Sequence, residues 1–411
     1  MHFIDNVQKE DYIKFSENHA KSHFLQSYAW GKFCEEIKGQ NARYVGIVDD
    51  NNNLIATSLI LLKKTPFGYS YGYAPRGFVL DYSDFDLIKT FTDYLKKYMQ
   101  KEKIIYIKFD PDIKYQDIDC DANPIENGEN NYKLYNYMLS LGYKHTGFYK
   151  LYEGNQPRYT FRINLNNDWE QIESKFSKSF MKSVKRSYNY DLIIDNKEVP
   201  EEFIRLAGYN STKNSYDAHN LKYYQVLSKE LSKNNNVKYF NVSLKPKEIV
   251  SNITKEIEDL KDSLNNNPKK EVDIKNQIIK LEKDYEIFKN IDKDEIMVCS
   301  LICTYTSNHA WSLFIGSDEV ANSTFAVSRA YYEAIKDSYA RKLDFFDLFG
   351  TTGDPHTTYK NLAKLHDFKR KFGDEYIEFI GEFDLVNNKL LYKVLPIMLK
   401  VYRKIRKIKK T

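Results

Sequence analysis

Basic side chains gather at three places in this 411-residue sequence, and their type and spacing suit one chemical task, the binding of an anion. One group lies between residues 175 and 186, a second is the run Lys369-Arg370-Lys371, and a third occupies residues 400–410. Phosphate contacts by such residues carry little sequence information but depend strongly on salt. The formal net charge of +5 is modest for this length, so the totals permit an anionic partner without requiring one.

Neither a covalent nucleophile nor a metal site is indicated. The sequence lacks a Gly-x-Ser-x-Gly motif and a Cys/His arrangement of a known catalytic type. The four cysteines (Cys34, Cys120, Cys299 and Cys303) show no metal-ligand spacing, and the last two flank an apolar segment that predicts buried thiols. We therefore predict no metal ion and no cofactor.

Two mixed α/β units must position these groups. The first unit, residues 1–153, contains predicted strands at 42–48, 54–62, 104–109 and 144–148, helices at 11–18, 87–99 and 132–141, and a Gly/Pro loop at 67–77 whose tyrosines should be exposed. The second unit, residues 154–246 and 294–384, contains predicted strands at 159–165, 191–194, 237–244, 297–305, 310–316, 343–348 and 376–380. Its predicted helices are at 169–188, 201–209, 221–231 and 325–340, with another ending at 366–371. The similar order of elements indicates a structural duplication.

Residues 247–293 interrupt the second unit and predict a helical arm. Apolar residues recur at spacings of three and four on both sides of Pro268, which ends the first helix (Ile253, Ile257, Leu260, Leu264, then Ile274, Ile278, Leu281, Tyr285 and Phe288). One narrow apolar stripe on each helix predicts an antiparallel coiled-coil hairpin. The outward faces are Lys, Glu, Asp and Asn, so the hairpin should project into solvent.

Residues 385–411 predict an amphipathic helix that Pro396 kinks and that ends in a basic cluster. Such a helix suits an anionic membrane face, and a docking helix with a solvated charged end is the alternative. Met1-His2-Phe3-Ile4-Asp5 turns polar at once, so we predict no signal peptide. The chain also lacks a run of about 18 apolar residues. A reducing cytoplasm is therefore expected, with peripheral contact to the inner face of the plasma membrane open.

Six separate stretches together resemble the Fem family of peptidoglycan bridge-forming aminoacyltransferases. They are Leu25-Gln26-Ser27-Tyr28-Ala29-Trp30-Gly31-Lys32, Tyr71-Gly72-Tyr73-Ala74-Pro75-Arg76-Gly77, Tyr106-Ile107-Lys108-Phe109-Asp110-Pro111, Gln156-Pro157-Arg158-Tyr159-Thr160, Phe346-Asp347-Leu348-Phe349-Gly350 and Asp367-Phe368-Lys369-Arg370-Lys371-Phe372-Gly373. Each motif alone is weakly specific, but their order and the inserted arm match across essentially the whole chain.

The resemblance implies two GNAT-like acyltransferase subdomains, the second carrying the inserted coiled-coil arm. It implies transfer of an amino acid from aminoacyl-tRNA, a co-substrate, to the stem-peptide amino group of a peptidoglycan precursor. The acceptor is lipid II or the UDP-linked muropeptide, and the basic tail favours the lipid-linked form. The sequence leaves open whether Gly, Ala or Ser is transferred.

The resemblance also assigns the catalytic roles. It implies that Lys369 stabilises the developing oxyanion and the tRNA end, and that the backbone carbonyl of Phe368 accepts a hydrogen bond from substrate. From the residues alone, Lys369 is a solvated lysine in a basic run. Because the ester is already activated, the protein should act through positioning and electrostatics.

Two residues of the first unit, Lys32 and Asp110, resemble the family's contacts to the acceptor. Lys32 fits as a phosphate binder, with an ordinary surface lysine as the alternative. Asp110 could hold a hydroxyl or the incoming ammonium, although Asp before Pro is also a common turn residue. Tyr106 joins them or belongs to the core. Arg76 is a further anion contact or a loop charge.

In the second unit, His219 and Tyr223 stand where the family often has Arg and, four residues later, Tyr. A neutral imidazole cannot replace a permanent bidentate donor, so we expect a weakened contact, and packing is the alternative for Tyr223. The expected tRNA contacts are Lys175, Lys178, Lys182, Lys185 and Arg186. The arm has nearly balanced charge and suits either tRNA handling or a homodimer contact.

Two other classes of protein compete with this interpretation. A non-catalytic tRNA- or membrane-binding protein of the same fold is favoured by the missing Arg at His219, whereas Lys32, Asp110 and Phe368-Lys369 favour the enzyme. An acyl-CoA-dependent acyltransferase would need an Arg/Gln-x-x-Gly-x-Gly/Ala loop before a helix, and the sequence has none.

Overall fold

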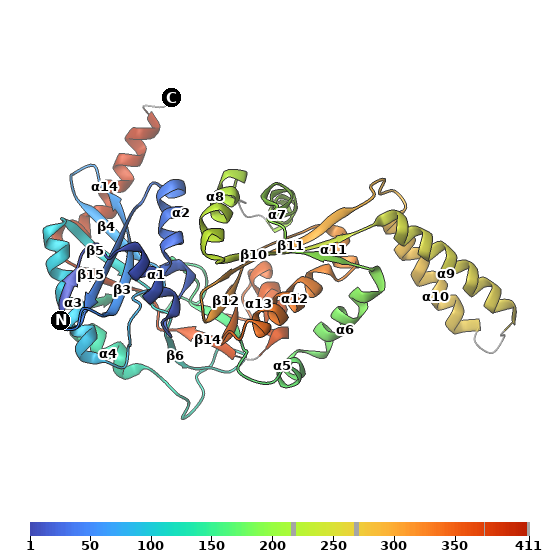
Figure 1. The fold of residues 1–411 in the computed structure, drawn as a ribbon, viewed down its shortest axis with the longest axis horizontal. Coiled ribbons are helices and arrows are strands. Elements are labelled where there is room, and N and C mark those ends of the chain that lie inside the picture. Colours follow the sequence, from blue (N-terminus) through green and yellow to red (C-terminus); the bar gives the residue numbers. More distant parts are fainter. Residues whose placement is uncertain (215–218, 267–270, 374, 409–411) are drawn as a thin grey trace.

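A computed structural model of the chain describes residues 1–214, 219–266, 271–373 and 375–408. Two β-sheets with covering helices lie side by side, and a helical arm projects from the second (Figure 1). The predicted mixed α/β class is confirmed.

The first sheet has the strand order β1-β2-β3-β4-β5-β15-β7. Its strands are β1 (His2–Ile4), β2 (Asn41–Val48), β3 (Leu54–Lys64), β4 (Ser70–Ala74), β5 (Ile104–Phe109), β15 (Phe383–Val386) and β7 (Tyr143–His145). The helices of this half are α1 (Lys9–Asn18), α2 (Tyr28–Lys38), α3 (Phe85–Lys101) and α4 (Tyr132–Ser140). One face of α3 is apolar, and Leu87, Phe91 and Leu95 are buried in the core of this half.

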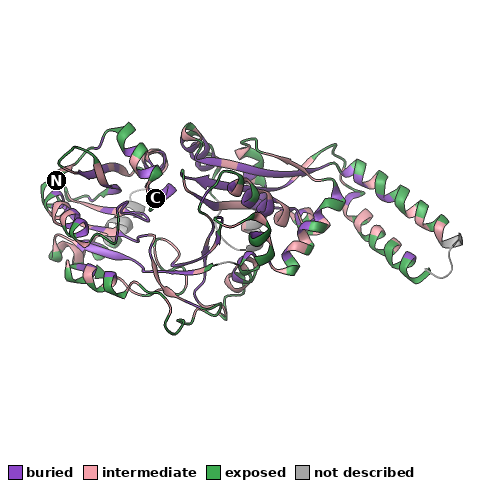
Figure 2. Ribbon diagram, turned by 60° about the horizontal axis from the view of Figure 1, so that its bottom comes forward, coloured by how far each residue is buried: buried purple, intermediate pink, exposed green. Residues whose placement is uncertain are grey.

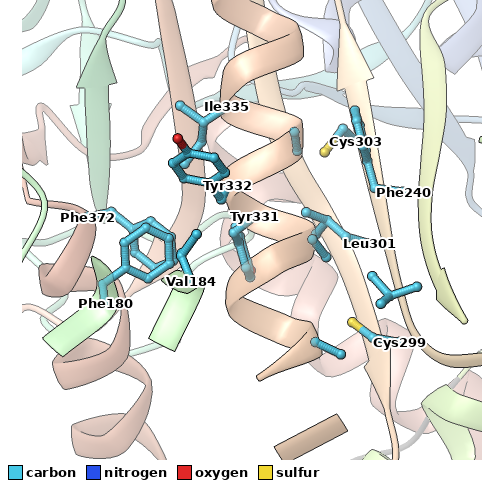
Figure 3. Close-up of a cluster of buried hydrophobic side chains, with 14 of the residues drawn as sticks. Phe180, Val184, Phe240, Cys299, Leu301, Cys303, Tyr331, Tyr332, Ile335 and Phe372 are labelled. Atoms are coloured by element: carbon cyan, nitrogen blue, oxygen red, sulfur yellow. The ribbon is translucent and has the colours of Figure 1, made fainter. Parts of the chain in front are cut away.

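The second sheet has the order β6-β14-β8-β13-β12-β11-β10-β9. Its strands are β6 (Lys114–Asp117), β14 (Glu375–Phe379), β8 (Tyr159–Asn164), β13 (Phe345–Thr351), β12 (His309–Ser317), β11 (Ile296–Tyr305), β10 (Val237–Leu244) and β9 (Ile193–Asp195). The helices of this half are α5 (Trp169–Lys175), α6 (Lys178–Ser187), α7 (Pro200–Asn214), α8 (Leu221–Leu231), α11 (Glu319–Ser323), α12 (Ala326–Ala340) and α13 (Lys360–Lys369). In the core, Tyr331 of α12 lies beside Leu301 of β11, and Ile335 of α12 belongs to the same cluster (Figure 3). Cys299 and Cys303 are buried there, as predicted.

The two sheets share a topology that supports the predicted duplication. In the first, β2, β3 and β4 are successive antiparallel neighbours, α3 follows, and β5 returns parallel to β4. In the second, β10, β11 and β12 are again antiparallel, α12 follows, and β13 returns parallel to β12. The strands β5 and β13 are therefore equivalent.

The two halves exchange strands, which corrects the predicted boundaries. Strand β6 belongs by sequence to residues 1–153 but pairs with β14 of the second sheet. Strand β15 begins at residue 383, yet it lies between β5 and β7 of the first sheet. Each strand has only four residues, too few to show the alternation that predicts a strand.

Two further local predictions are corrected. The loop at 67–77 contains strand β4, and its tyrosines Tyr69, Tyr71 and Tyr73 are half-buried, since β4 pairs with both β3 and β5. The predicted helix at 169–188 is two helices, because the Ser177 side chain accepts the N–H of Phe180 and begins α6 afresh.

The arm consists of α9 (Pro246–Asn266) and α10 (Glu271–Phe288), which pack against each other between the paired strands β10 and β11. Ile253, Ile274 and Phe288 of the predicted stripe are buried, and the other described members are half-buried. Figure 2 shows the exposed outer faces. The predicted apolar stripe is confirmed, while the Leu264 side chain and the turn at Pro268 lie outside the described part.

Helix α14 (Lys389–Ile408) follows β15 and runs through Pro396. It begins four residues later than predicted because 383–386 form a strand. Tyr392 and Leu395 face the first sheet, whereas Leu390 and Ile397 are 72% and 66% exposed. The predicted basic side chains beyond 400 lie outside the described side chains. Among the described helices, none is long and apolar enough to cross a membrane.

Candidate active site

The chain crosses from the first sheet to the second through Asp110, Pro111 and Asp112, between β5 and β6. Asp110 is 3% exposed. One of its carboxylate oxygens accepts the Tyr73 hydroxyl at 2.9 Å, and the other accepts the backbone N–H of Arg76 at 2.8 Å. Burial raises the pKa of Asp110 to about 7, although Arg76 opposes the shift. This carboxyl group therefore changes its charge near neutral pH.

Arg76 is buried beside Asp110. Its Nη2 donates to the Pro157 carbonyl at 2.6 Å, and its guanidinium lies 4.1 Å from the centre of the Phe379 ring. The predicted loop charge is therefore wrong, because the side chain joins the two halves. These two contacts within the protein hold the side chain in place.

Lys369, at the end of α13, is buried at the end of β13. Its Nζ donates to the carbonyl oxygens of Phe349 at 2.9 Å and Gly350 at 2.7 Å. Burial lowers the pKa of Lys369 to about 7, and Asp347 opposes this shift. An ammonium has three donors, so these two contacts leave one for a substrate oxygen. The prediction of a solvated lysine is wrong, because the helix turns this side chain inward.

Phe368 packs its ring against Tyr331 and Phe372, at centroid distances of 5.5 and 5.2 Å. Its carbonyl, at the C-terminal end of α13, accepts the backbone N–H of Arg370. A carbonyl oxygen has a second lone pair, which a substrate donor could use. The side chain is thus structural, and only the backbone is suited to the predicted role.

Asp110 directly follows β5, and the Lys369 side chain binds the end of the equivalent strand β13. A chain of contacts joins them. Asp110 accepts the backbone N–H of Arg76, and the Arg76 side chain donates to the Pro157 carbonyl. Pro157 packs against Gly350, whose carbonyl accepts from Lys369. A Cβ on Gly350 would lie 2.1 Å from Pro157, so glycine is required there. The structure therefore brings these two predicted residues to one boundary between the halves.

Sequence reasoning missed a buried charge cluster at the same boundary. Arg162 of β8 lies between Asp112 and Asp347 and pairs with both. Arg158, the residue before that strand, pairs with Glu378 at 2.8 Å. In the alternating strand Tyr159–Asn164, Arg162 takes a polar position, so the pattern gave no indication that it is enclosed with carboxylate partners.

Lys32 lies elsewhere, in a cavity of about 640 Å³ between the two halves. The cavity is lined by residues of α1, α2, α8 and the segment after α8 (Lys9, Tyr28, Ala29, Lys32, Glu35, Glu36, Glu230, Lys233 and Asn234). The Lys32 ammonium binds Glu35 at 2.8 Å, which raises its pKa and keeps it cationic. It is thus available to a phosphate that displaces Glu35.

His219 and Tyr223 come together close to α2. Their rings are stacked at 3.7 Å, and Tyr223 is buried against Phe33, the neighbour of Lys32, at 4.9 Å. Partial desolvation by the neighbouring rings and the charge of Lys38 lower the pKa of His219, so this imidazole is neutral at pH 7. The packing alternative for Tyr223 is supported, while His219 remains exposed at the edge of the stack.

Tyr106 belongs to another surface. Its ring stacks on Tyr71 at 5.7 Å and meets Tyr392 of α14 edge-on at 5.2 Å. Burial raises the pKa of Tyr106 to about 12. Helix α14 covers this residue, so the alternative that Tyr106 belongs to the packed interior is the one that the contacts support.

The predicted tRNA contacts Lys178, Lys182 and Lys185 lie exposed on one face of α6. With Met181, Arg186 and Asn189 they line a hollow of about 400 Å³. The Arg186 guanidinium lies 4.4 Å from the centre of the Phe325 ring. Lys175 ends the separate helix α5. The basic face of α6 thus exists as predicted, without Lys175.

Comparison with known proteins agrees with this architecture. The chain is 24% identical over 433 residues to the lipid II:glycine glycyltransferase of Staphylococcus epidermidis, covering 98% of the chain and 99% of the relative. The enzymes of the same name from Staphylococcus haemolyticus and Staphylococcus aureus are 25% and 23% identical, over 95% of the chain and 94% of each relative. These names confirm the prediction of a transferase.

A solved structure shares the fold. The crystal structure of FemX superposes with a TM-score of 0.78 at 21% identity, covering 96% of this chain and 99% of that one. This match confirms the predicted fold class. The model of the FemAB family matches residues 7–400, nearly the whole chain. The protein therefore belongs to the FemAB family, the family that its six sequence motifs predicted.

Proposed function

We propose that this protein transfers an amino acid from aminoacyl-tRNA to the stem-peptide amino group of lipid II and so builds the interpeptide bridge. The observation that carries the proposal is the burial of Lys369 on two carbonyl oxygens, at the boundary that also holds Asp110. Membership of the FemAB family and the names of the relatives support it.

The proposed reaction is the aminolysis of an ester. The neutral amine of the acceptor attacks the aminoacyl carbonyl, a tetrahedral oxyanion forms, the C–O bond breaks, and the tRNA hydroxyl leaves with a proton from the amine. The remaining donor of Lys369 stabilises the oxyanion in a water-poor site, where electrostatic effects are strongest. The Phe368 carbonyl accepts a hydrogen bond from the aminoacyl group.

Two sites bind the acceptor, one at Asp110 and one at Lys32. Ionised Asp110 holds the incoming amine before it loses its proton, and Lys32 binds the pyrophosphate in the cavity between α2 and α8. Phe24 connects the two places, because its ring contacts both Trp30 of α2 and Phe349. No step of this scheme uses a cofactor.

The basic face of α6 serves the donor. Three exposed lysines spaced at four and three residues present cations in one row, which matches a phosphate backbone. The arm projects from the same half (Figure 1), and we infer that it limits how a long polyanion can approach. These contacts set affinity, and they do not choose the amino acid.

Helix α14 favours the lipid-linked acceptor. Leu390 and Ile397 are exposed on the same helix as exposed Lys389, Lys393 and Lys400, so apolar and cationic groups are available together to an anionic membrane surface. The soluble UDP-linked muropeptide is not held at a membrane surface, so this helix would give it no advantage.

Purified protein with lipid II and mixtures of aminoacyl-tRNAs, each carrying one labelled amino acid, tests the proposal. We expect label in the muropeptide from one of the glycyl, alanyl or seryl mixtures, and a lower rate with UDP-muropeptide. Absence of label from every mixture, with competent tRNA and precursor controls, would leave the non-catalytic binding protein as the better account.

A further inference from the structure

Arg162 connects two carboxylates, buried Asp347 on β13 of the second half and largely buried Asp112 in the segment that leaves β5 of the first half. Its Nε donates to Asp347 of β13 at 2.7 Å, and its Nη2 donates to Asp112, just after β5, at 2.5 Å. The three side chains are 12%, 3% and 12% exposed (Arg162, Asp347 and Asp112). Such a cluster is costly to bury, and breaking it leaves an uncompensated charge inside the protein.

Each carboxylate shapes a segment that carries a proposed active-site group. Asp347 accepts the backbone N–H of Phe349 and the Thr160 hydroxyl, both at 2.6 Å. Phe349 has φ +59°, and the pairing of β13 with β8 is irregular between Asp347 and Gly350. The carbonyl groups of this irregular segment are the ones that bind Lys369. Asp112 lies two residues after Asp110.

A second contact strengthens the connection. The Phe379 ring lies 5.3 Å from the Arg162 guanidinium and 4.1 Å from that of Arg76, whose backbone N–H binds Asp110. Movement of Arg162 therefore disturbs the surroundings of both segments.

We infer that Arg162 is a positioning residue, which fixes the carbonyl groups that hold Lys369 relative to Asp110 across the boundary between the two halves. This inference rests on the proposed function for the roles of Lys369 and Asp110. The planar guanidinium is essential, because one lysine ammonium cannot donate in fixed directions to both carboxylates.

Arg162→Lys tests the inference, because lysine keeps the positive charge but lacks the planar guanidinium that donates to both carboxylates. We expect kcat to fall about tenfold to a hundredfold, as a displacement of about 1 Å would cause, with KM for both substrates within about twofold. The matched control is Arg341→Lys: Arg341 also pairs through Nε with an aspartate, at 2.8 Å, and lies over an aromatic ring. The control should keep the wild-type kcat. A normal kcat in Arg162→Lys would overturn the inference.

A double-mutant cycle separates positioning from general destabilisation. If Arg162 acts through Lys369, then Arg162→Lys should lower the residual rate of Lys369→Met by less than twofold. An equal fold-loss in both backgrounds would contradict a role through Lys369.

One readout is independent of transfer activity. Pulse acetylation with acetic anhydride at pH 9, read by mass spectrometry, measures how accessible the Lys369 amine is. We expect the rate at Lys369 to rise at least threefold in Arg162→Lys and to stay constant in Arg341→Lys. An unchanged rate refutes the inference even where the wild type transfers nothing, so failure of the proposed function and failure of the inference remain distinguishable.

Discussion

The Nζ atom of Lys369 lies 2.7 Å from the carbonyl oxygen of Gly350, at the end of the strand that is equivalent to the one before Asp110. This contact holds an amine in the protein interior, and burial lowers the pKa of Lys369 to about 7. Burial also raises the pKa of Asp110 to about 7. A cation and an anion that both titrate near neutral pH make the reaction sensitive to pH.

The ratio of wild-type rate to Lys369→Met rate should fall as pH rises from 6 to 9. Lys369 is protonated below its pKa, so its stabilisation of the oxyanion is present at pH 6 and is lost through pH 7. We expect a ratio of about a hundred at pH 6, the usual effect of one oxyanion donor. Taking the ratio cancels titration of the acceptor amine. A ratio that rises with pH would instead identify Lys369 as a general base.

The free energy of unfolding should also depend on pH because of Lys369. The lysine pKa is about 10.4 in an unfolded chain and about 7 in the fold, so between these values only the unfolded state binds the proton. The free energy of unfolding of the wild type should therefore rise relative to Lys369→Met from pH 7 to pH 10, by up to about 4 kcal/mol. Urea unfolding at pH 6.5, 8 and 9.5 measures this difference. Parallel curves would show that Lys369 is solvated.

Asp110→Asn should lower kcat/KM for the acceptor about tenfold to a hundredfold at pH 8, since the amide cannot pair with the incoming ammonium. The defect should shrink below pH 7, where the wild-type carboxyl is itself neutral. The control is Asp49→Asn, an exposed turn aspartate that also accepts backbone N–H groups. Equal defects at pH 6 and pH 8 would refute a role for the charge.

Replacing Lys178, Lys182 and Lys185 together by Glu should weaken aminoacyl-tRNA binding and flatten its salt dependence by two to three units of slope, about one unit for each lost phosphate contact. Filter binding between about 50 and 200 mM salt measures both quantities. The control reverses the charge of three lysines on α3, Lys89, Lys97 and Lys101. Equal losses in the two triple variants would argue for a general charge effect.

The sequence predicted those parts of the fold that periodicity encodes. Val237–Leu244 and Leu221–Leu231 form elements with the predicted bounds, because apolar residues recur at strand spacing in the first and at helix spacing in the second. The apolar stripe likewise predicted the arm. Short β6 and β15 were not, because four residues show no period and their pairing partners are far away in the chain.

The site, too, has residues that the sequence indicated and residues that only the structure revealed. Motifs indicated Lys369 and Asp110, but only the three-dimensional structure shows that α13 turns Lys369 inward and that β5 and β13 are equivalent. Arg162 and Asp347 escaped notice because a salt bridge between residues 185 positions apart leaves no local signal. For Arg76 the sequence left an anion contact and a loop charge open, and only the structure shows that its side chain is buried between the two halves.

Single-turnover transfer tests the central claim most directly. Wild-type protein and Lys369→Met are mixed with the labelled aminoacyl-tRNA that is active in the steady-state assay and with saturating lipid II, and the label in the muropeptide is followed from pH 6 to pH 9. The account predicts transfer by the wild type and a loss of about a hundredfold in the variant at pH 6, with unchanged tRNA affinity. Equal transfer rates for the two proteins would contradict it.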